Sequence, residues 1–148
     1  MGLYELVWTE PITFVSGTLN AQGYLDILDK NVWPVVAKHF PKNDYIFQDD
    51  GASIHTAKII KAYKDQNGMK TMSWPPKSPD LNIIENLWAI LKHNIRKEVN
   101  NIETIEDLKA VIVKCWDNIP LSYVRSLYTS MPRRCRMVSV LKGHRTKY

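Results

Sequence analysis

The chain has 148 residues, of which 45% are hydrophobic and 24% charged, with a formal net charge of +5 and a pI of about 9.2. This length and composition predict one globular domain with its own core, and the lack of a run of about 18 apolar residues excludes a membrane span. The two cysteines, Cys115 and Cys135, stand far apart and in no metal-binding spacing, which indicates inert thiols in a reducing compartment.

The first third of the chain predicts two short strands and a helix. Residues 4–8 and 11–16 are typical of strands separated by a turn at Pro11. Asn20 is a typical N-cap residue, so a helix is expected to start there and to end near Phe40. Pro34 should kink or divide this helix, because proline lacks the N–H that a helix interior needs.

The next segment predicts a strand, a helix and a second strand. Residues 45–48 form a short apolar run, residues 56–66 have helical periodicity, and residues 69–74 form another short run after Asn67-Gly68. Two strands joined by a helix are expected to be parallel, with a right-handed crossover. The helix should bury Ile59, Ile60 and Tyr63 and expose Lys58, Lys61 and Lys64.

The last third predicts a run of helices. One covers residues 83–97, and a second begins at Thr104, where Asp107 completes a variant of the capping box. A third starts at Pro120 and should end before Pro132. Strands followed by helices predict an α/β fold, a mixed sheet flanked by helices with extra helices at the C-terminus.

Two acidic residues are the candidate functional residues. Asp50 follows the strand at residues 45–48, Glu85 lies in the first turn of the helix at residues 83–97, and 34 residues separate them. Carboxylate oxygens are the ligands that Mg²⁺ prefers, which points to metal-dependent chemistry on phosphodiesters.

Each of these residues also has a purely structural interpretation. Asp50 can form a turn by accepting a hydrogen bond from the backbone two residues on, and Glu85 can cap its helix together with Asn82. His55 is often a hydrogen-bonding residue at a helix start, and a neutral imidazole suits Mg²⁺ poorly. The tryptophans in this region, Trp74 and Trp88, are most simply packing residues.

Several motifs resemble those of a known family. Residues 47–56 read FQDDGASIHT, Trp74-Pro75 follows, and residues 78–88 read SPDLNIIENLW. Together with residues 14–21 and the terminal MPRR and TKY sequences, they resemble the catalytic core of the mariner-type transposases of the DDE superfamily. The resemblance runs from about residue 11 to the end. It implies an RNase H-like fold and an acidic triad of two aspartates and one glutamate.

Carried over by position, the resemblance assigns catalysis and metal binding to Asp50, as the second acid, and to Glu85, as the third. It implies a two-metal site for Mg²⁺ or Mn²⁺. Asp49 stands where the family commonly has glutamine, so it receives no catalytic role. Residues 51–54 depart from the usual turn of the family, and Ile83 replaces a proline often found there.

The first acid of the triad has no counterpart, because residues 1–10 contain no aspartate. Residues 1–148 are therefore expected to form a single partial catalytic domain that lacks the first, central strand and the helix-turn-helix region. The expected function is DNA cleavage and strand transfer, with the isolated chain inactive. Two alternatives stay open: a non-catalytic remnant that binds DNA or a partner, and an unrelated α/β domain with accidental motifs.

The resemblance implies double-stranded DNA as the partner, at transposon ends and target, together with a nuclear location. It leaves a homodimer open and implies no membrane. Basic residues cluster in the last sixteen positions, where they either contact phosphates or are solvated. The candidate phosphate contacts are Lys92, Arg96, Lys97, Arg133 and Arg134.

Overall fold

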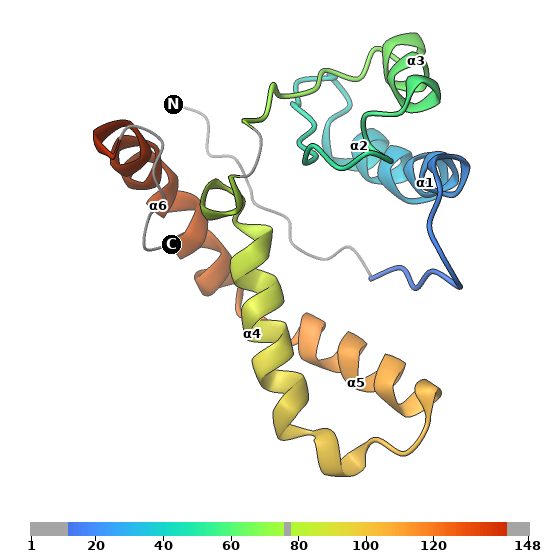
Figure 1. Cartoon of the computed structure of the whole chain (residues 1–148), viewed down its shortest axis with the longest axis vertical. Helices are drawn as coiled ribbons and strands as arrows, with labels where there is room; N and C mark the ends of the chain where they lie inside the picture. The colour runs from blue at the N-terminus through green and yellow to red at the C-terminus, as the bar shows by residue number, and fades with distance from the viewer. Residues whose placement is uncertain (1–11, 76–77, 142–148) are drawn as a thin grey trace. The chain divides into compact units, whose positions relative to one another are not determined.

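The structure, a computed structural model, describes residues 12–75 and 78–141 as helices joined by loops (Figure 1). The chain divides into two compact units. One contains residues 15–75 of the described part, and the other contains residues 12–14 and 78–141. Each unit is described below by itself. The strand predicted at residues 4–8 lies outside the described residues.

The first unit begins with a helix interrupted near its middle. α1 (Ala21–Ile27) is followed by a π-helical stretch, η1 (Leu28–Val32), and by α2 (Trp33–His39). The Asn20 side chain accepts a hydrogen bond of 2.8 Å from the Gly23 N–H, which confirms the predicted N-cap. Pro34 lies in the first turn of α2, directly after the π-helical stretch. The backbone stays in the right-handed helical region throughout, so the predicted kink or division takes the form of this irregular turn.

α3 (Lys58–Gln66) ends at Asn67, and Gly68 follows with a φ of +62°, as the C-cap pattern predicted. The segments that precede and follow α3 meet at a parallel bridge between Phe47 and Thr71. The Phe47 N–H donates to the Lys70 carbonyl at 2.7 Å, and the Met72 N–H donates to the Phe47 carbonyl at 2.9 Å. The predicted parallel pairing of these segments is therefore confirmed at a single point.

Two small apolar clusters stabilise this unit. Tyr24, Leu28 and Ile60 form one, and Val36, Tyr45 and Met69 form the other. A polar relay adds to them. The Trp33 indole N–H donates to the Tyr63 hydroxyl at 2.5 Å, which donates to Asp29 at 3.0 Å. This relay ties α3 to η1 and α2.

The second unit is built on three helices. η2 (Pro79–Leu81) leads into α4 (Ile84–Lys97), and η3 (Val99–Asn101) connects it to α5 (Ile105–Asp117), which packs against α4 (Figure 1). Thr104 and Asp107 form the predicted capping box at the start of α5. α6 (Leu121–Val140) completes the unit. The core consists of Leu87, Leu91, Cys115, Trp116, Ile119, Val124 and Leu127.

The end predicted for the last helix was wrong. α6 continues through Pro132 to Val140. A proline inside a helix costs about 3 kcal/mol. Beyond it, however, the Arg134 guanidinium is buried and donates hydrogen bonds to Ser130, Asp80 and Asn86, and bonds to a charged group contribute about 1.5–3 kcal/mol each. These contacts outweigh the break in the backbone hydrogen bonds.

The predicted mixed sheet is not seen in the described residues, which show only the bridge of Phe47 with Thr71. Residues 12–16 have no regular structure, and Phe14 and Val15 are exposed. A strand needs a partner for its backbone groups, and short apolar runs do not supply one. Within the described ranges, no helix has the length and apolar character needed to cross a membrane.

Candidate metal-binding carboxylates

Asp50 lies in the loop that follows Phe47, and its carboxylate organises that loop. Its Oδ1 accepts a hydrogen bond of 2.9 Å from the Ala52 N–H and lies 2.6 Å from the Nδ1 of His55. The turn-forming interpretation of Asp50 is therefore realised. The side chain nevertheless stays 54% exposed, and both contacts use the same oxygen.

The environment of Asp50 keeps its carboxylate ionised. The hydrogen bond from the Ala52 N–H lowers the pKa of Asp50 most, burial opposes it, and the hydrogen bond to His55 and its charge lower the pKa further. An ionised carboxylate with an oxygen facing solvent is a suitable ligand for a hard divalent cation. A turn-forming role and a metal-binding role are thus compatible in this side chain.

His55 is positioned by packing as well as by Asp50. Its ring lies 4.4 Å, centroid to centroid, from the ring of Tyr24, a buried residue of α1. Burial raises the pKa of the Tyr24 hydroxyl, and the negative charges of Asp49 and Asp50 raise it further. Tyr24 is therefore a neutral neighbour of both acids, a role that its helical spacing in the sequence did not reveal.

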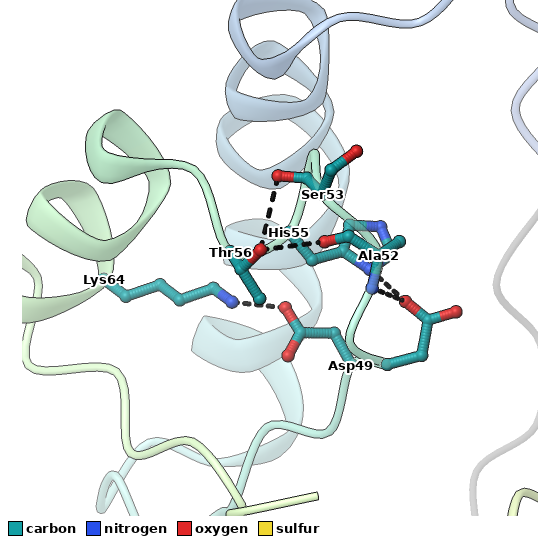
Figure 2. Close-up of polar contacts among 7 residues, drawn as sticks. Asp49, Ala52, Ser53, His55, Thr56 and Lys64 are labelled. Atoms are coloured by element: carbon teal, nitrogen blue, oxygen red, sulfur yellow. Dashed lines mark hydrogen bonds and ion pairs between the residues drawn. The ribbon is translucent and has the colours of Figure 1, made fainter. Parts of the chain in front are cut away.

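Asp49 faces a different partner from Asp50. Its Oδ2 forms an ion pair with the Nζ of Lys64 on α3, and the two side chains are only 15% and 8% exposed (Figure 2). The Lys64 ammonium also lies 5.5 Å from the centroid of the Phe47 ring. The expectation that Lys64 is exposed was wrong. Lys64 follows the fully buried Ile60 by four positions, so both lie on the same face of the helix.

Glu85 is exposed in the first turn of α4. The predicted capping arrangement with Asn82 does not form, because the Asn82 Oδ1 accepts instead from the Ile84 N–H, at 3.4 Å. A carboxylate in this turn is favoured by the helix dipole. Of the structural roles considered for Glu85, only the favourable interaction with the helix dipole remains. Its side chain is exposed to solvent.

Asp50 and Glu85 belong to different compact units, each of which supplies one exposed carboxylate. In the described part of the chain, no three His, Cys, Asp or Glu side chains gather into a metal-binding group. The donors fit a hard cation in kind, because both are carboxylates. A complete coordination sphere would need further oxygen ligands or water.

The candidate phosphate-contacting residues differ in their exposure to solvent. Lys92, Arg96 and Lys97 are exposed on α4, and Arg133 is exposed on α6. Arg134 is 2% exposed, and its guanidinium donates to Ser130, to the Asp80 carbonyl and to Asn86. It is therefore not free to contact DNA. Its burial follows from the continuation of α6, which places it seven residues after Leu127 on the same face.

The comparisons with known proteins agree with one another. Residues 1–109 match the family described as DDE superfamily endonuclease. The chain is 32% identical over 137 residues to the Tc3 transposable-element transposase of Caenorhabditis elegans, an alignment that covers 93% of this chain and 41% of that protein. It is 33% identical over 149 residues to the Tcb2 transposase of Caenorhabditis briggsae, covering 99% and 53%.

A third relative, the Tc1 transposase of Caenorhabditis elegans, is 27% identical over 146 residues, covering 93% of this chain and 50% of that protein. The chain thus spans about half the length of the curated relatives it matches. These comparisons confirm the expected transposase relationship. The named relatives are Tc1- and Tc3-type elements, so the finer assignment to the mariner type stays a prediction.

Proposed function

The chain belongs to the DDE superfamily endonuclease family, and on that premise we propose that it forms part of a transposase catalytic domain in which Asp50 and Glu85 bind divalent metal ions. The family implies an RNase H-like fold. The observation that carries the proposal is the state of Asp50: it is ionised and half-exposed, and it is oriented by the Ala52 N–H and by His55.

Mg²⁺ or Mn²⁺ is the proposed cofactor, in the two-metal arrangement of the family. When bound, such ions polarise a phosphodiester and stabilise the charge that develops during its cleavage. The residues of this chain would supply ligands and orientation. Asp50 and Glu85 offer carboxylate oxygens, and His55 fixes the rotamer of Asp50 through the oxygen that the Ala52 N–H also contacts.

Asp49 is left out of the proposed ligand set. Its charge is already neutralised by Lys64 in a mostly buried pair, and withdrawing it from that pair would leave the Lys64 ammonium buried without a counter-ion. The adjacent acids therefore have separate tasks, one structural and one chemical.

We propose further that this chain by itself binds metal without cleaving DNA. Two carboxylates neutralise only two of the four positive charges of a pair of divalent ions, so the second ion would be held weakly. A Mg²⁺- or Mn²⁺-dependent nicking activity that disappears in Asp50→Asn would refute this part of the proposal.

Double-stranded DNA, as transposon ends and target, is the proposed partner, in the nucleus, and a homodimer belongs to the same proposal. The supporting observation is the exposure of Lys92, Arg96 and Lys97 in the last turns of α4. If these cations contact phosphates, replacing all three by glutamine should lower the slope of log affinity against log salt by about 3. An unchanged slope would show that these three residues do not contact DNA phosphates.

The second candidate function is a non-catalytic module that binds DNA or a partner through its basic helices. The exposed cations of α4 and Arg133 favour it independently of the acids. It predicts salt-dependent DNA binding that is indifferent to Mn²⁺, to Asp50 and to Glu85. Metal binding therefore separates the two functions.

The test is a Mn²⁺ titration of the full chain followed by water-proton relaxation. Asp50→Asn and Glu85→Gln should each weaken Mn²⁺ binding by about ten-fold or more, since even the loss of a residue that only orients a ligand costs about 10- to 100-fold. Asp65→Asn and Glu103→Gln are matched controls, because both residues are exposed carboxylates outside the proposed site. If the controls weaken binding as much as the candidates, the proposed ligands are wrong.

A further inference from the structure

The start of α4 is anchored by a residue that lies far away in the sequence. Nη1 of Arg134, on α6, donates to the Asp80 carbonyl in η2 and to the Asn86 Oδ1 in α4, each at 2.9 Å. Nε of Arg134 donates to the Ser130 hydroxyl at 2.8 Å. The guanidinium therefore joins the turn before α4, the first turn of α4 and its own helix.

This anchor adds to local hydrogen bonds that already hold the start of α4 in part. The helix start has no side-chain cap, and Ile83 stands at the N-cap position. The Leu87 N–H reaches the Ile83 carbonyl only at 3.4 Å, which is long for a backbone hydrogen bond. The Glu85 N–H donates to the Asn82 carbonyl at 3.2 Å and the Asn86 N–H to the Ile83 carbonyl at 3.1 Å, so the turn is formed locally and tertiary contacts add to it. Arg134 supplies polar ones, and the burial of Leu87 supplies an apolar one.

Glu85 stands between the anchored parts. It follows η2, whose Asp80 carbonyl accepts from Arg134, and it directly precedes Asn86, whose side chain accepts from the same nitrogen. Successive residues of a helix point about 100° apart, so fixing Asn86 inward fixes the outward direction of Glu85. The Glu85 side chain stays exposed, while its backbone is held on both sides.

We propose that Arg134 is a positioning residue for Glu85: its buried guanidinium sets the place and direction of the helix turn that carries this carboxylate, and so its affinity for a divalent ion. The inference rests on the proposed role of Glu85 as a metal ligand. Residues that orient a ligand typically change metal affinity by about 10- to 100-fold. Arg134 acts through the backbone of the ligand, so we expect a smaller effect than this range, about five- to ten-fold.

The direction of the change in Mn²⁺ affinity distinguishes a positioning role of Arg134 from a simple effect of its positive charge. If Arg134 acted only as a nearby positive charge, Arg134→Met would strengthen Mn²⁺ binding, because it removes a repulsion. Positioning predicts the opposite. Arg134→Lys keeps the charge but loses the planar fork that reaches several acceptors, so it should weaken Mn²⁺ binding as well. Arg136→Met removes a charge from the exposed face of the same helix and measures the charge effect alone.

The experiment is the Mn²⁺ titration of the full chain with Arg134→Lys, Arg134→Met, Asn86→Ala and Arg136→Met, each in the parent and in the Glu85→Gln background. Asn86→Ala removes one acceptor and leaves the contacts of Arg134 with Ser130 and Asp80, so it decides the question if an Arg134 variant does not fold. We expect weaker binding in the Arg134 and Asn86 variants, no weakening in Arg136→Met, and no additional loss when Glu85 is already glutamine.

The outcomes distinguish the two proposals. If Glu85→Gln binds Mn²⁺ like the parent chain, the proposed metal-binding function of Glu85 fails. If Glu85→Gln weakens binding while Arg134→Lys and Asn86→Ala do not, the positioning role fails and the function stands. A further loss of affinity when these changes are added to Glu85→Gln would show a general structural effect, and that result would overturn the inference too.

Discussion

The ion pair between Lys64 and Asp49 allows a quantitative test of how the Asp50 loop is held in place. In Lys64→Met the methylene chain can still pack beside Phe47, but the ammonium is lost. The Asp49 carboxylate would then remain, 15% exposed, without its counter-ion. Breaking a fully buried pair by removing one partner costs about 3–5 kcal/mol. Because this pair keeps some exposure, we expect a loss of about 2–3 kcal/mol in the free energy of unfolding.

The measurement is urea denaturation followed by far-UV circular dichroism. Because the chain divides into two compact units, amide exchange in α3 serves as a local probe of the unit that holds this pair. Lys61→Met is the matched control. It removes the same charge from the exposed face of α3 and should stay within about 0.5 kcal/mol of the parent chain.

A double-mutant cycle isolates the pair. Replacing both partners, as Asp49→Asn with Lys64→Met, removes the buried charges together and should cost less than the sum of the single changes by about 1–2 kcal/mol. Additive losses would mean that the two side chains do not interact in solution. A Lys64→Met variant as stable as Lys61→Met would refute the buried position of Lys64.

Three further changes test the first unit in the same denaturation assay. Leu28→Ala should lower the unfolding free energy by about 2–5 kcal/mol, because Leu28 is 0% exposed, and a loss below about 1 kcal/mol would contradict its burial. Tyr45→Phe should raise it by about 1 kcal/mol, since the buried Tyr45 hydroxyl has no hydrogen-bond partner among the described residues; a clear loss would show that this hydroxyl is bonded. Asp50→Asn should be destabilised relative to the parent at pH 7. The pKa of Asp50 is lowered from 3.8 in the folded chain, so the stability that its ionised form contributes is lost as the pH falls below about 4. The difference in stability between the parent and Asp50→Asn should therefore shrink there. A difference that grows at low pH would contradict the lowered pKa.

Local signals in the sequence were sufficient where a helix end depends on its own residues. The Asn20 cap, the Thr104–Asp107 capping box and the Gly68 turn all form within a few residues of chain, so each could be predicted without tertiary information. Pro34 belongs with them, because its effect falls on the adjacent turn.

Signals that depend on distant partners were misjudged. Residues 12–16 and 45–48 have strand-like compositions, but strand pairing requires a second segment, and only Phe47 and Thr71 meet among the described residues. Pro132 correctly predicts a local cost. It could not predict the contacts of Arg134 with Asp80 and Asn86, which lie about 50 residues earlier and allow α6 to continue.

The two proposed metal ligands share a local design that the sequence did not reveal. Asp50 is exposed, whereas its neighbour Asp49 is turned inward to the buried ammonium of Lys64. Glu85 is exposed, whereas its neighbour Asn86 is turned inward to the buried guanidinium of Arg134. Asp50 is also oriented directly by the Ala52 N–H and by His55, and the inward-turned neighbour adds a further constraint beside each acid. In both places a buried cation holds the neighbour inward and the acid stays exposed. The two basic residues that were expected to be exposed, one at a solvated surface and one on DNA, are among the most buried charges described.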